Sequence, residues 1–330
     1  MTLASASADI TIDAWSGRVE NATPRERSAI RFLRTAATAM NPFHLYGYSY
    51  VVRVARSLLP SKRRMVFVLG EDCRMRTDYC DAYWSMLLRP NYRYEPSIRA
   101  LIDASRDVEY GFIDGGANHG FWSIIVSGPQ AGGKKTIAVE AASDTFDHLA
   151  DNCSLNGGRF TALNRAIDAG SGVLVRIYGA KHEARSIVAP SSDAKPILDC
   201  ETISLDDLAA RPEFADLDKF IVKLDLEGVE VTAFAGATKL LDADTAFIYE
   251  EHGSDRSHEN TRYALQTLGL RVFWLGDADA RELKSAEEVA PIKRSRRFGY
   301  DMVGTRSRFW IERLEQLVAS GNASRKPFRN

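Results

Sequence analysis

The 330-residue sequence contains few cysteines and no long apolar run. Cys73, Cys80, Cys153 and Cys200 are too few and too scattered for a disulfide scaffold, and none belongs to a CxxC pair of the kind found in structural zinc sites. No stretch approaches the ~20 uninterrupted apolar residues that a membrane-spanning helix needs. Residues 1–13 lack the basic and apolar regions of a signal peptide. We therefore expect a cytoplasmic protein in a reducing compartment, without stable membrane insertion.

The sequence also has no excess of charge of one sign. The chain has 43 basic and 44 acidic residues, a formal charge of −1, so no global field attracts nucleic acid or anionic lipid. The apolar fraction of 45% is that of an ordinary globular protein. At roughly 100–200 residues per domain, this length allows one large or two modest domains. We expect no nucleic-acid partner, and the sequence leaves the oligomeric state open.

The first 60 residues differ in pattern from the rest. Residues 1–20 resemble a loose tail, and residues 24–59 have the apolar spacing of helices, which should stop at Pro60. We interpret the basic residues of this helical region as solvated, with contact to an anionic membrane surface as the alternative. We assign residues 1–64 to an N-terminal tail and helical extension, and residues 65–330 to the main domain.

Beyond residue 110, short apolar strands alternate with stretches that predict helices of 10–15 residues. The expected strands are 112–113, 136–139, 160–163, 173–178, 220–224, 246–249, 270–275 and 300–303. This alternation is typical of βαβ units around a parallel sheet. Because such sheets bind ligands beyond the carboxyl ends of their strands, functional residues are expected there.

A glycine-rich loop, Asp114–Gly120 (DGGANHG), follows the first of these strands. Its spacing is not the GxGxxG of dinucleotide-binding folds. The glycines would let the backbone approach a ligand closely, and free N–H groups at the next helix start could meet a carboxylate or phosphate. Asp114 would repel a pyrophosphate but suits a cationic ligand such as S-adenosylmethionine, which has an ammonium and a sulfonium group. The alternative is an ordinary glycine-rich turn.

Glu140 ends the next expected strand, 26 residues after Asp114. A carboxylate at this place can accept hydrogen bonds from both hydroxyl groups of a ribose. The alternative is a solvent-facing side chain that opens a loop.

Two further acidic clusters follow later strands. In residues 223–230 (KLDLEGVE), Asp225 stands at the end of an apolar strand, with Glu227 and Glu230 just beyond. Burying such charges is costly unless they are paired or ligand-bound. Hard-cation sites need more oxygen ligands than this stretch supplies, so we predict no metal site. Residues 249–252 (YEEH) should place two acids and an imidazole at the same edge of the sheet.

Taken in order, these blocks resemble the FkbM family of S-adenosylmethionine-dependent methyltransferases. The blocks are DGGANHG, VEAASDTFDHLADNCSLN, ISLDDL, VKLDLEGVEVTAFAGATKLL and FIYEEH. The resemblance covers about residues 92–304. It departs from the family pattern at Ala141, where proline is usual, and at Ser204, where threonine is usual.

The resemblance implies an α/β class I (Rossmann-like) methyltransferase fold, whose seven-stranded, mostly parallel sheet has an antiparallel last strand, here residues 300–304. It implies that S-adenosylmethionine is the cofactor and that its binding residues are Asp114, Gly116, Ala117, Asn118, Gly120, Glu140 and Asp225. The usual acceptors of the family are hydroxyl groups of sugars, polysaccharides and natural products. We therefore expect O-methylation of a small-molecule or glycan acceptor.

A hydroxyl acceptor gains about 10²–10⁴-fold in rate from a well-placed general base. The candidate catalytic residues are Asp225, Glu250 and His252, with His119 of the glycine loop as a fourth. Histidine is the side chain whose ordinary pKa best suits neutral pH, whereas Glu250 matches the family pattern better. The polar residues 178–199 are expected to form a loop over the acceptor.

Two other classes of function compete with this interpretation. One is an NAD-dependent oxidoreductase on a related sheet, against which the missing GxGxxG and the carboxylate of Asp114 argue. The other is a non-catalytic module that binds S-adenosylmethionine, or has lost it, and serves as a partner surface. The intact glycines and acids argue against such a loss.

Overall fold

The chain divides into two compact units. The computed structural model describes residues 9–41, 45–179, 185–187, 195–276, 280–296 and 299–320. The first, or N-terminal, unit runs to Tyr94 and includes Ser154–Gly157, and the second, or C-terminal, unit comprises Glu95–Cys153 and resumes at Gly158. The sequence had led us to place the domain boundary thirty residues earlier, between residues 64 and 65.

The N-terminal unit contains a four-stranded sheet in the order β2-β1-β3-β4. Its strands are β1 (Ile10–Asp13), β2 (Val19–Glu20), β3 (Met65–Gly70) and β4 (Cys73–Thr77). The prediction of a loose tail is therefore wrong for residues 10–13 and 19–20. The fully buried Ile10 and Ile12 alternate with half-buried residues, a two-residue signal too short to recognise in the sequence.

Two helices connect β1 and β2 to β3. They are α1 (Pro24–Met40) and α2 (Tyr48–Leu58), and a short 3₁₀ helix, η2 (Trp84–Leu88), follows β4. Thr23 caps α1 in a capping box with Glu26, and α2 ends two residues before Pro60, as predicted. Because β3 pairs in parallel with β1, the chain from β1 to β3 forms one crossover unit, which joins residues 65–70 to the helices.

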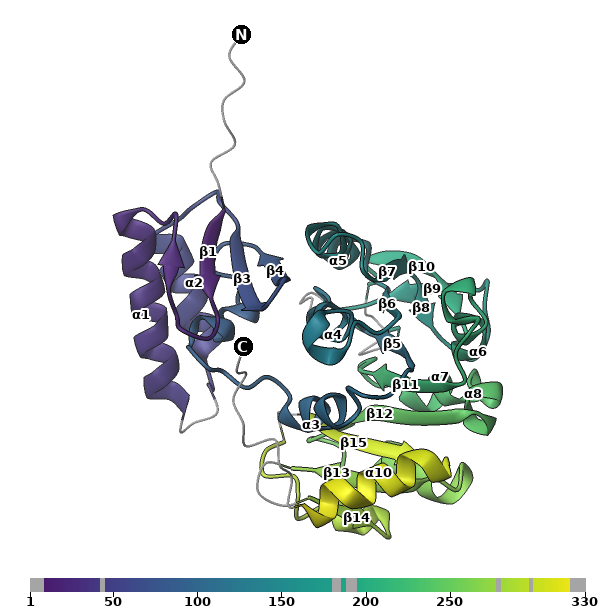
Figure 1. Ribbon diagram of the computed structural model, residues 1–330. Helices are drawn as coiled ribbons and strands as arrows, with labels where there is room; N and C mark the ends of the chain where they lie inside the picture. Colours follow the sequence, from purple (N-terminus) through teal and green to yellow (C-terminus); the bar gives the residue numbers. More distant parts are fainter. Residues whose placement is uncertain are drawn as a thin grey trace. The chain divides into compact units, whose positions relative to one another are not determined.

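The C-terminal unit is built on an eight-stranded sheet in the order β14-β13-β15-β12-β11-β5-β6-β7 (Figure 1). Its strands are β5 (Gly111–Gly115), β6 (Thr136–Glu140), β7 (Thr161–Asn164), β11 (Lys219–Leu224), β12 (Asp244–His252), β13 (Arg271–Leu275), β14 (Ala280–Leu283) and β15 (Gly299–Thr305). The strands β7, β6, β5, β11 and β12 are parallel, and β15 lies antiparallel between β12 and β13.

This order confirms the predicted class I methyltransferase fold, including the antiparallel strand at residues 300–304. The sheet has one strand more than predicted because β14 forms a hairpin with β13. The strand expected at 173–178 lies instead in a separate three-stranded sheet, in the order β8-β10-β9. The members of that sheet are β8 (Ala166–Ile167), β9 (Leu174–Ile177) and β10 (Leu198–Ile203).

Helices connect the strands of the C-terminal unit. They are α3 (Pro96–Ala104), α4 (Phe121–Val126), α5 (Ser143–Leu155), α6 (Leu205–Ala209), α7 (Glu230–Ala235), α8 (Thr238–Asp242), α9 (Glu259–Arg262) and α10 (Arg308–Ala319). The described residues of this unit also form three 3₁₀ helices, η3 (Pro129–Ala131), η4 (Pro212–Phe214) and η6 (Ala286–Val289), and one π-helix, η5 (Tyr263–Thr267). Most of these helices are shorter than the 10–15 residues predicted.

The core of the C-terminal unit lies between the parallel strands and their helices. Ile113, Ile137, Val222 and Phe247 from four adjacent strands are almost fully buried there. This packing fixes the carboxyl ends of β5, β6, β11 and β12 side by side. No helix within the described residues is long and apolar enough to cross a membrane.

Candidate functional site

The glycine loop lies between the ends of β6 and β11. The amide groups of Gly116 and Ala117 both donate to the carbonyl oxygen of Val139, at 3.0 and 2.9 Å. Gly116 has a φ of 71°, and a Cβ atom at this position would lie 1.9 Å from the carbonyl oxygen of Asp225. Only glycine fits so close to that backbone, so the loop conformation depends on Gly116.

Gly120 and Asn118 also adopt positive φ values, of 85° and 51°. Gly120 is the N-cap of α4, where a Cβ atom would lie 2.7 Å from the side chain of Leu149. The amide of Asn118 donates to the Glu140 carboxylate at 3.0 Å. The loop is therefore tied to β6 by a side chain as well as by the backbone.

Glu140 is 8% exposed, so the alternative of a solvent-facing side chain is wrong. Its two carboxylate oxygens accept hydrogen bonds from the amides of Asn118 and Ala142, both at 3.0 Å. The carboxylate is thus held rigidly at the end of β6, while its ribose-binding role stays a prediction.

Asp114 is 1% exposed, and one of its oxygens accepts from the amide and hydroxyl groups of Ser123, at 3.1 and 2.6 Å. The other oxygen, Oδ1, has no hydrogen-bond partner among the described residues. Burial raises the pKa of Asp114, and the Lys223 ammonium works in the opposite direction. A buried acceptor without a donor is costly, so a ligand with a donor would be favoured there.

Lys223 lies at the centre of a buried group of acids. It is 4% exposed, and its Nζ atom is 3.0 Å from the carboxylate of Asp225. Burial opposes its charge, but Asp225, Glu95 and Asp114 together raise the pKa of Lys223 well above its usual value. One ammonium group is therefore shared by several carboxylates.

Sequence reasoning missed two members of this group, Glu95 and Asp301. The indole N–H of Trp122 donates to Glu95 at 2.5 Å, and the hydroxyl of Ser97 donates to Asp301 at 2.7 Å. Burial raises the pKa of Glu95 to about 8 and that of Asp301 to about 6, while Lys223 lowers both. Glu95 carries a weak sequence signal, an acid directly before the proline that starts α3, whereas Asp301 carries none.

The end of β12 carries the YEEH segment on two faces of the sheet. Glu250 lies opposite Asp301 of β15, and His252 lies opposite Gly299, so Glu250 and His252 share one face. Glu251 points to the other face and is 1% exposed. There it lies 3.9 Å from both Lys293 and His258, so the structure does not bring Glu251 to the site.

Glu250 and His252 are close enough to act together, with His252 Nδ1 3.4 Å from Glu250 Oε2. Burial, followed by the carboxylates of Asp225 and Glu227, raises the pKa of Glu250 well above its usual value. Glu227, Glu250 and His252 each offer one ligand atom, and these atoms lie within 4.8 Å of one another. Such a set could hold a divalent cation or serve as a proton acceptor.

Two other candidates from the sequence have structural roles. Glu230 is fully buried and accepts from the amide of Leu226 at 3.0 Å, which fixes the loop after β11. His119 is 2% exposed, and its ring stacks on that of His148 with centroids 4.4 Å apart. The structure therefore does not support His119 as a base.

The structure thus brings most of the predicted residues to one edge of the sheet. They are Asp114, Gly116, Ala117, Asn118, Gly120, Glu140, Asp225, Glu250 and His252. The loop expected over the acceptor, residues 178–199, lies largely outside the described residues. With its surplus of carboxylates over cations, the site is suited to a cationic ligand.

Comparison with known proteins gives one family match. The family described as "Methyltransferase FkbM domain" matches residues 114–272, from the end of β5 to β13. No curated protein matches the chain significantly.

Several solved structures are similar at low identity. Methyltransferase FkbM from Methylobacillus flagellatus KT has a TM-score of 0.38 and 11% identity, over 59% of this chain and 43% of that chain. Precorrin-6y C5,15-methyltransferase from Geobacter metallireducens GS-15 has a TM-score of 0.35 and 14% identity, over 64% and 88% of the two chains. A SAM-dependent O-methyltransferase from Thermotoga maritima has a TM-score of 0.34 and 14% identity, over 65% of each. The matched part of the chain spans less than half of the first protein's length.

Proposed function

We propose that the chain transfers a methyl group from S-adenosylmethionine to a hydroxyl group, since residues 114–272 match the methyltransferase FkbM domain family. The acceptor in this proposal is a small molecule or a glycan. The observation that carries it is the acid-rich edge of the sheet around Lys223, beside a loop in which Gly116 touches the backbone of Asp225.

The charge of the site supports S-adenosylmethionine over a nicotinamide cofactor. S-adenosylmethionine has two cationic centres, and the acidic side chains of Glu95, Asp114, Asp225 and Asp301 surround a single ammonium group. A bound cation would favour the ionised forms of those acids whose pKa is raised by burial. In dinucleotide-binding folds the pyrophosphate of NAD binds at the helix N-terminus that follows the glycine-rich loop. Acidic side chains beside that loop would repel it here. The unpartnered Asp114 Oδ1 also fits a ligand that donates a hydrogen bond.

When bound, S-adenosylmethionine supplies an electrophilic methyl group on a sulfonium. The task of the chain is to hold the acceptor oxygen in line with the carbon–sulfur bond, and such positioning is worth up to roughly 7–11 kcal/mol. As the oxygen–carbon bond forms and the carbon–sulfur bond breaks, the hydroxyl proton must pass to a base of the protein. S-adenosylhomocysteine and the methyl ether are the products.

We assign the Glu250–His252 pair as the base that accepts the proton of the acceptor hydroxyl group. His252 is partly exposed and lies on the same face as Glu250, whose carboxyl group is near enough to orient the imidazole. Asp225, the third candidate, is engaged by Lys223 at 3.0 Å and serves better as its counter-charge. Glu251, which points to the opposite face of the sheet, and His119, whose ring stacks on His148, have no part in this proton transfer.

A comparison of Asp225→Asn, Glu250→Gln and His252→Ala tests the assignment. For each variant, turnover and cofactor affinity would be measured with a panel of hydroxylated acceptors. We expect turnover to fall about 10²–10⁴-fold in His252→Ala while cofactor affinity is kept. Near-normal turnover in all three variants would show that proximity alone carries the reaction.

The Glu227–Glu250–His252 set has a second possible use as a divalent-cation site. Three ligand atoms fall short of the six to eight oxygens that hard cations prefer, which supports the base over the metal. We therefore expect turnover to persist in excess EDTA. Loss of turnover that Mg²⁺ restores would reassign these side chains as metal ligands.

A non-catalytic role is the remaining competitor. A chain that binds S-adenosylmethionine but transfers no methyl group to any hydroxylated acceptor would favour it. We also propose a cytoplasmic location, supported by four cysteines that are all free thiols.

A further inference from the structure

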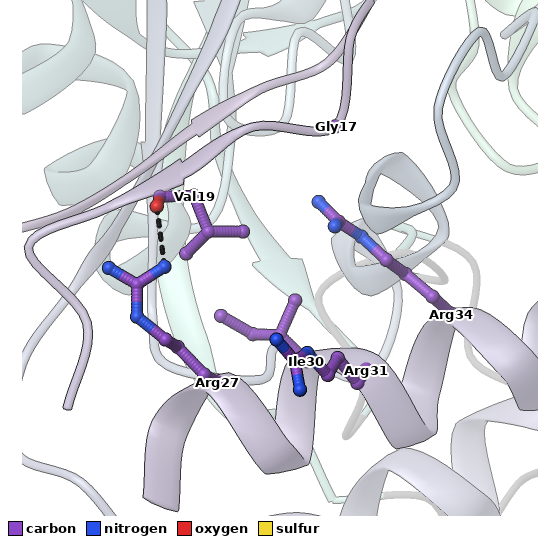
Figure 2. A pocket seen from close by; sticks show the side chains of 6 residues that line it. All are labelled: Gly17, Val19, Arg27, Ile30, Arg31 and Arg34. Atoms are coloured by element: carbon purple, nitrogen blue, oxygen red, sulfur yellow. Dashed lines mark hydrogen bonds between the residues drawn. The ribbon is translucent and has the colours of Figure 1, made fainter. Parts of the chain in front are cut away.

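A small cavity lies in the N-terminal unit, between α1 and the segment from Gly17 to Val19. Its volume is about 200 Å³. The lining residues are Gly17, Val19, Arg27, Ile30, Arg31 and Arg34. Figure 2 shows Arg27 and Arg34 extending from α1 toward the Gly17–Val19 segment, on either side of Ile30. The cavity thus has an apolar floor and three guanidinium groups in its wall.

Two of these arginines, Arg27 and Arg34, are held by neutral groups. Arg27 donates to the carbonyl oxygens of Val19 and Ala22, at 2.7 and 3.1 Å. Arg34 donates through Nε to the carbonyl oxygen of Leu88 at 2.8 Å. Backbone carbonyls fix the direction of a guanidinium group without neutralising its charge.

Nearby acids are engaged elsewhere. Glu20 pairs with Arg18 at 2.6 Å, and Glu26 pairs with Arg63 at 2.8 Å. Within the described parts of the chain, no carboxylate forms an ion pair with any of the three cavity arginines. Like charges at this helical spacing repel one another, so the arrangement has a cost that an anion would remove.

Arg34 shows this lack of a counter-charge most clearly. Its Nη2 atom is buried and has no hydrogen-bond partner within the described residues. Burial lowers the pKa of Arg34, because a guanidinium group removed from water is less stable when charged. An anion in the cavity would compensate this buried charge.

The whole N-terminal unit favours such a ligand. Residues 1–94 contain 14 basic and 8 acidic residues, a formal charge of +6. This excess raises the local concentration of anions near the cavity.

We propose that this cavity binds a phosphate group. A dianion matches a cavity lined by three arginines better than a carboxylate does, and guanidinium groups bind phosphate oxygens with paired, charge-assisted hydrogen bonds. At about 200 Å³ the cavity is smaller than the roughly 300–1,000 Å³ of drug-sized ligand sites, so it suits a phosphate with at most a small group attached. The phosphate belongs to a soluble sugar phosphate or to a lipid headgroup. The site does not depend on the proposed methyl transfer.

Binding to the full chain tests the proposal. Calorimetric titrations would use inorganic phosphate and glucose 1-phosphate, and sedimentation would use phosphatidylcholine vesicles with and without phosphatidic acid. We expect binding that weakens with salt and at least a tenfold loss in Arg31→Glu. Arg31 is exposed and no ion pair or hydrogen bond of its side chain is described, so this variant should fold normally.

Arg25→Glu is the matched control, because Arg25 is an exposed arginine of α1 outside the cavity lining. It changes the charge equally and should keep most of the affinity. A soluble source is assigned if glucose 1-phosphate binds in this Arg31-dependent way, and a lipid source if only the phosphatidic acid vesicles do. An equal loss in the two variants, or no binding to any of these probes, would overturn the proposal.

Discussion

The N-terminal and C-terminal regions of the chain carry opposite charges. Residues 1–94 have a formal charge of +6, whereas residues 95–330, with 29 basic and 36 acidic residues, have −7. In the first region, arginines line a cavity and form no ion pair with a carboxylate of the described residues, and in the second, acidic side chains are buried around one lysine. The net charge of −1 hides two local fields of opposite sign. Each field suits a different ligand, an anion in the first region and a cation in the second.

The largest expected effect concerns Gly116. Gly116→Ala should abolish S-adenosylmethionine binding, because a Cβ atom would lie 1.9 Å from the Asp225 carbonyl oxygen. Gly158→Ala is the control, since Gly158 has a similar φ of 68° but nothing within 4 Å of its Cβ position. Calorimetry should find binding in the control alone. If Gly116→Ala folds and binds normally, the loop is an ordinary turn.

The next effect is catalytic. His252→Ala should lose about 10²–10⁴-fold in turnover while S-adenosylmethionine affinity is kept. Phosphate binding by the N-terminal unit should stay unchanged in this variant, because His252 belongs to the other region. Turnover close to that of the parent would rule out the imidazole as the base.

Glu140→Gln should weaken S-adenosylmethionine binding more than tenfold. Its amide nitrogen would have to face the N–H group of Asn118 or Ala142, both of which now donate to the carboxylate. Hydrogen bonds to charged groups are worth about 1.5–3 kcal/mol each, so losing one accounts for this factor. An unchanged dissociation constant would remove Glu140 from the site.

A smaller effect should appear in stability. Burial raises the pKa of Glu95 to about 8, so the folded chain holds a proton that the unfolded chain has already lost. The associated stability is present below the ordinary glutamate pKa and disappears as the pH rises toward 8. Ligand-free Glu95→Gln should therefore lose less stability than the parent between about pH 5 and pH 8.

Thermal unfolding measures this difference, since about 1 kcal/mol corresponds to roughly 2–4 °C in a domain of this size. Glu109→Gln, at an exposed acid of the same unit that lies 3.5 Å from Lys134, is the control for the loss of one acidic side chain. Parallel curves for Glu95→Gln and the parent would show that burial does not raise the pKa of Glu95.

The last prediction is that one substitution has no effect on cofactor binding. Arg31→Glu should leave S-adenosylmethionine affinity unchanged, because Arg31 lines a cavity of the N-terminal unit. A calorimetric change beyond twofold would mean that the two regions are energetically coupled, and the comparison between them would need revision.

The C-terminal sheet was predictable because its strands are local apolar runs followed by distinctive turns. The ends of β5, β6 and β11 each combine a buried strand with glycine or acid, and the predicted site follows from that pattern. The fold of residues 1–94 was not predictable in the same way. Its strand β1 has only two buried residues, and its partner β3 lies more than fifty residues away.

The two site residues that the sequence analysis did not identify, Asp301 and Glu95, have a similar explanation. Asp301 lies opposite Glu250 only because β15 is inserted between β12 and β13. Glu95 reaches Lys223 only through tertiary packing, across more than 120 residues of sequence. Neither position has a periodicity or a motif that marks it, so the full extent of the acid cluster depends on the assembled sheet.

The most direct test of the account is a calorimetric titration of the full chain with S-adenosylmethionine, S-adenosylhomocysteine and NAD. The acid-rich edge of the sheet predicts one site per chain for S-adenosylmethionine, competition by S-adenosylhomocysteine, and no binding of NAD. The same titration with Gly116→Ala should show no heat of binding. Binding of NAD at this site, or no binding of S-adenosylmethionine by the parent chain, would contradict the proposal that this edge holds a cationic methyl donor.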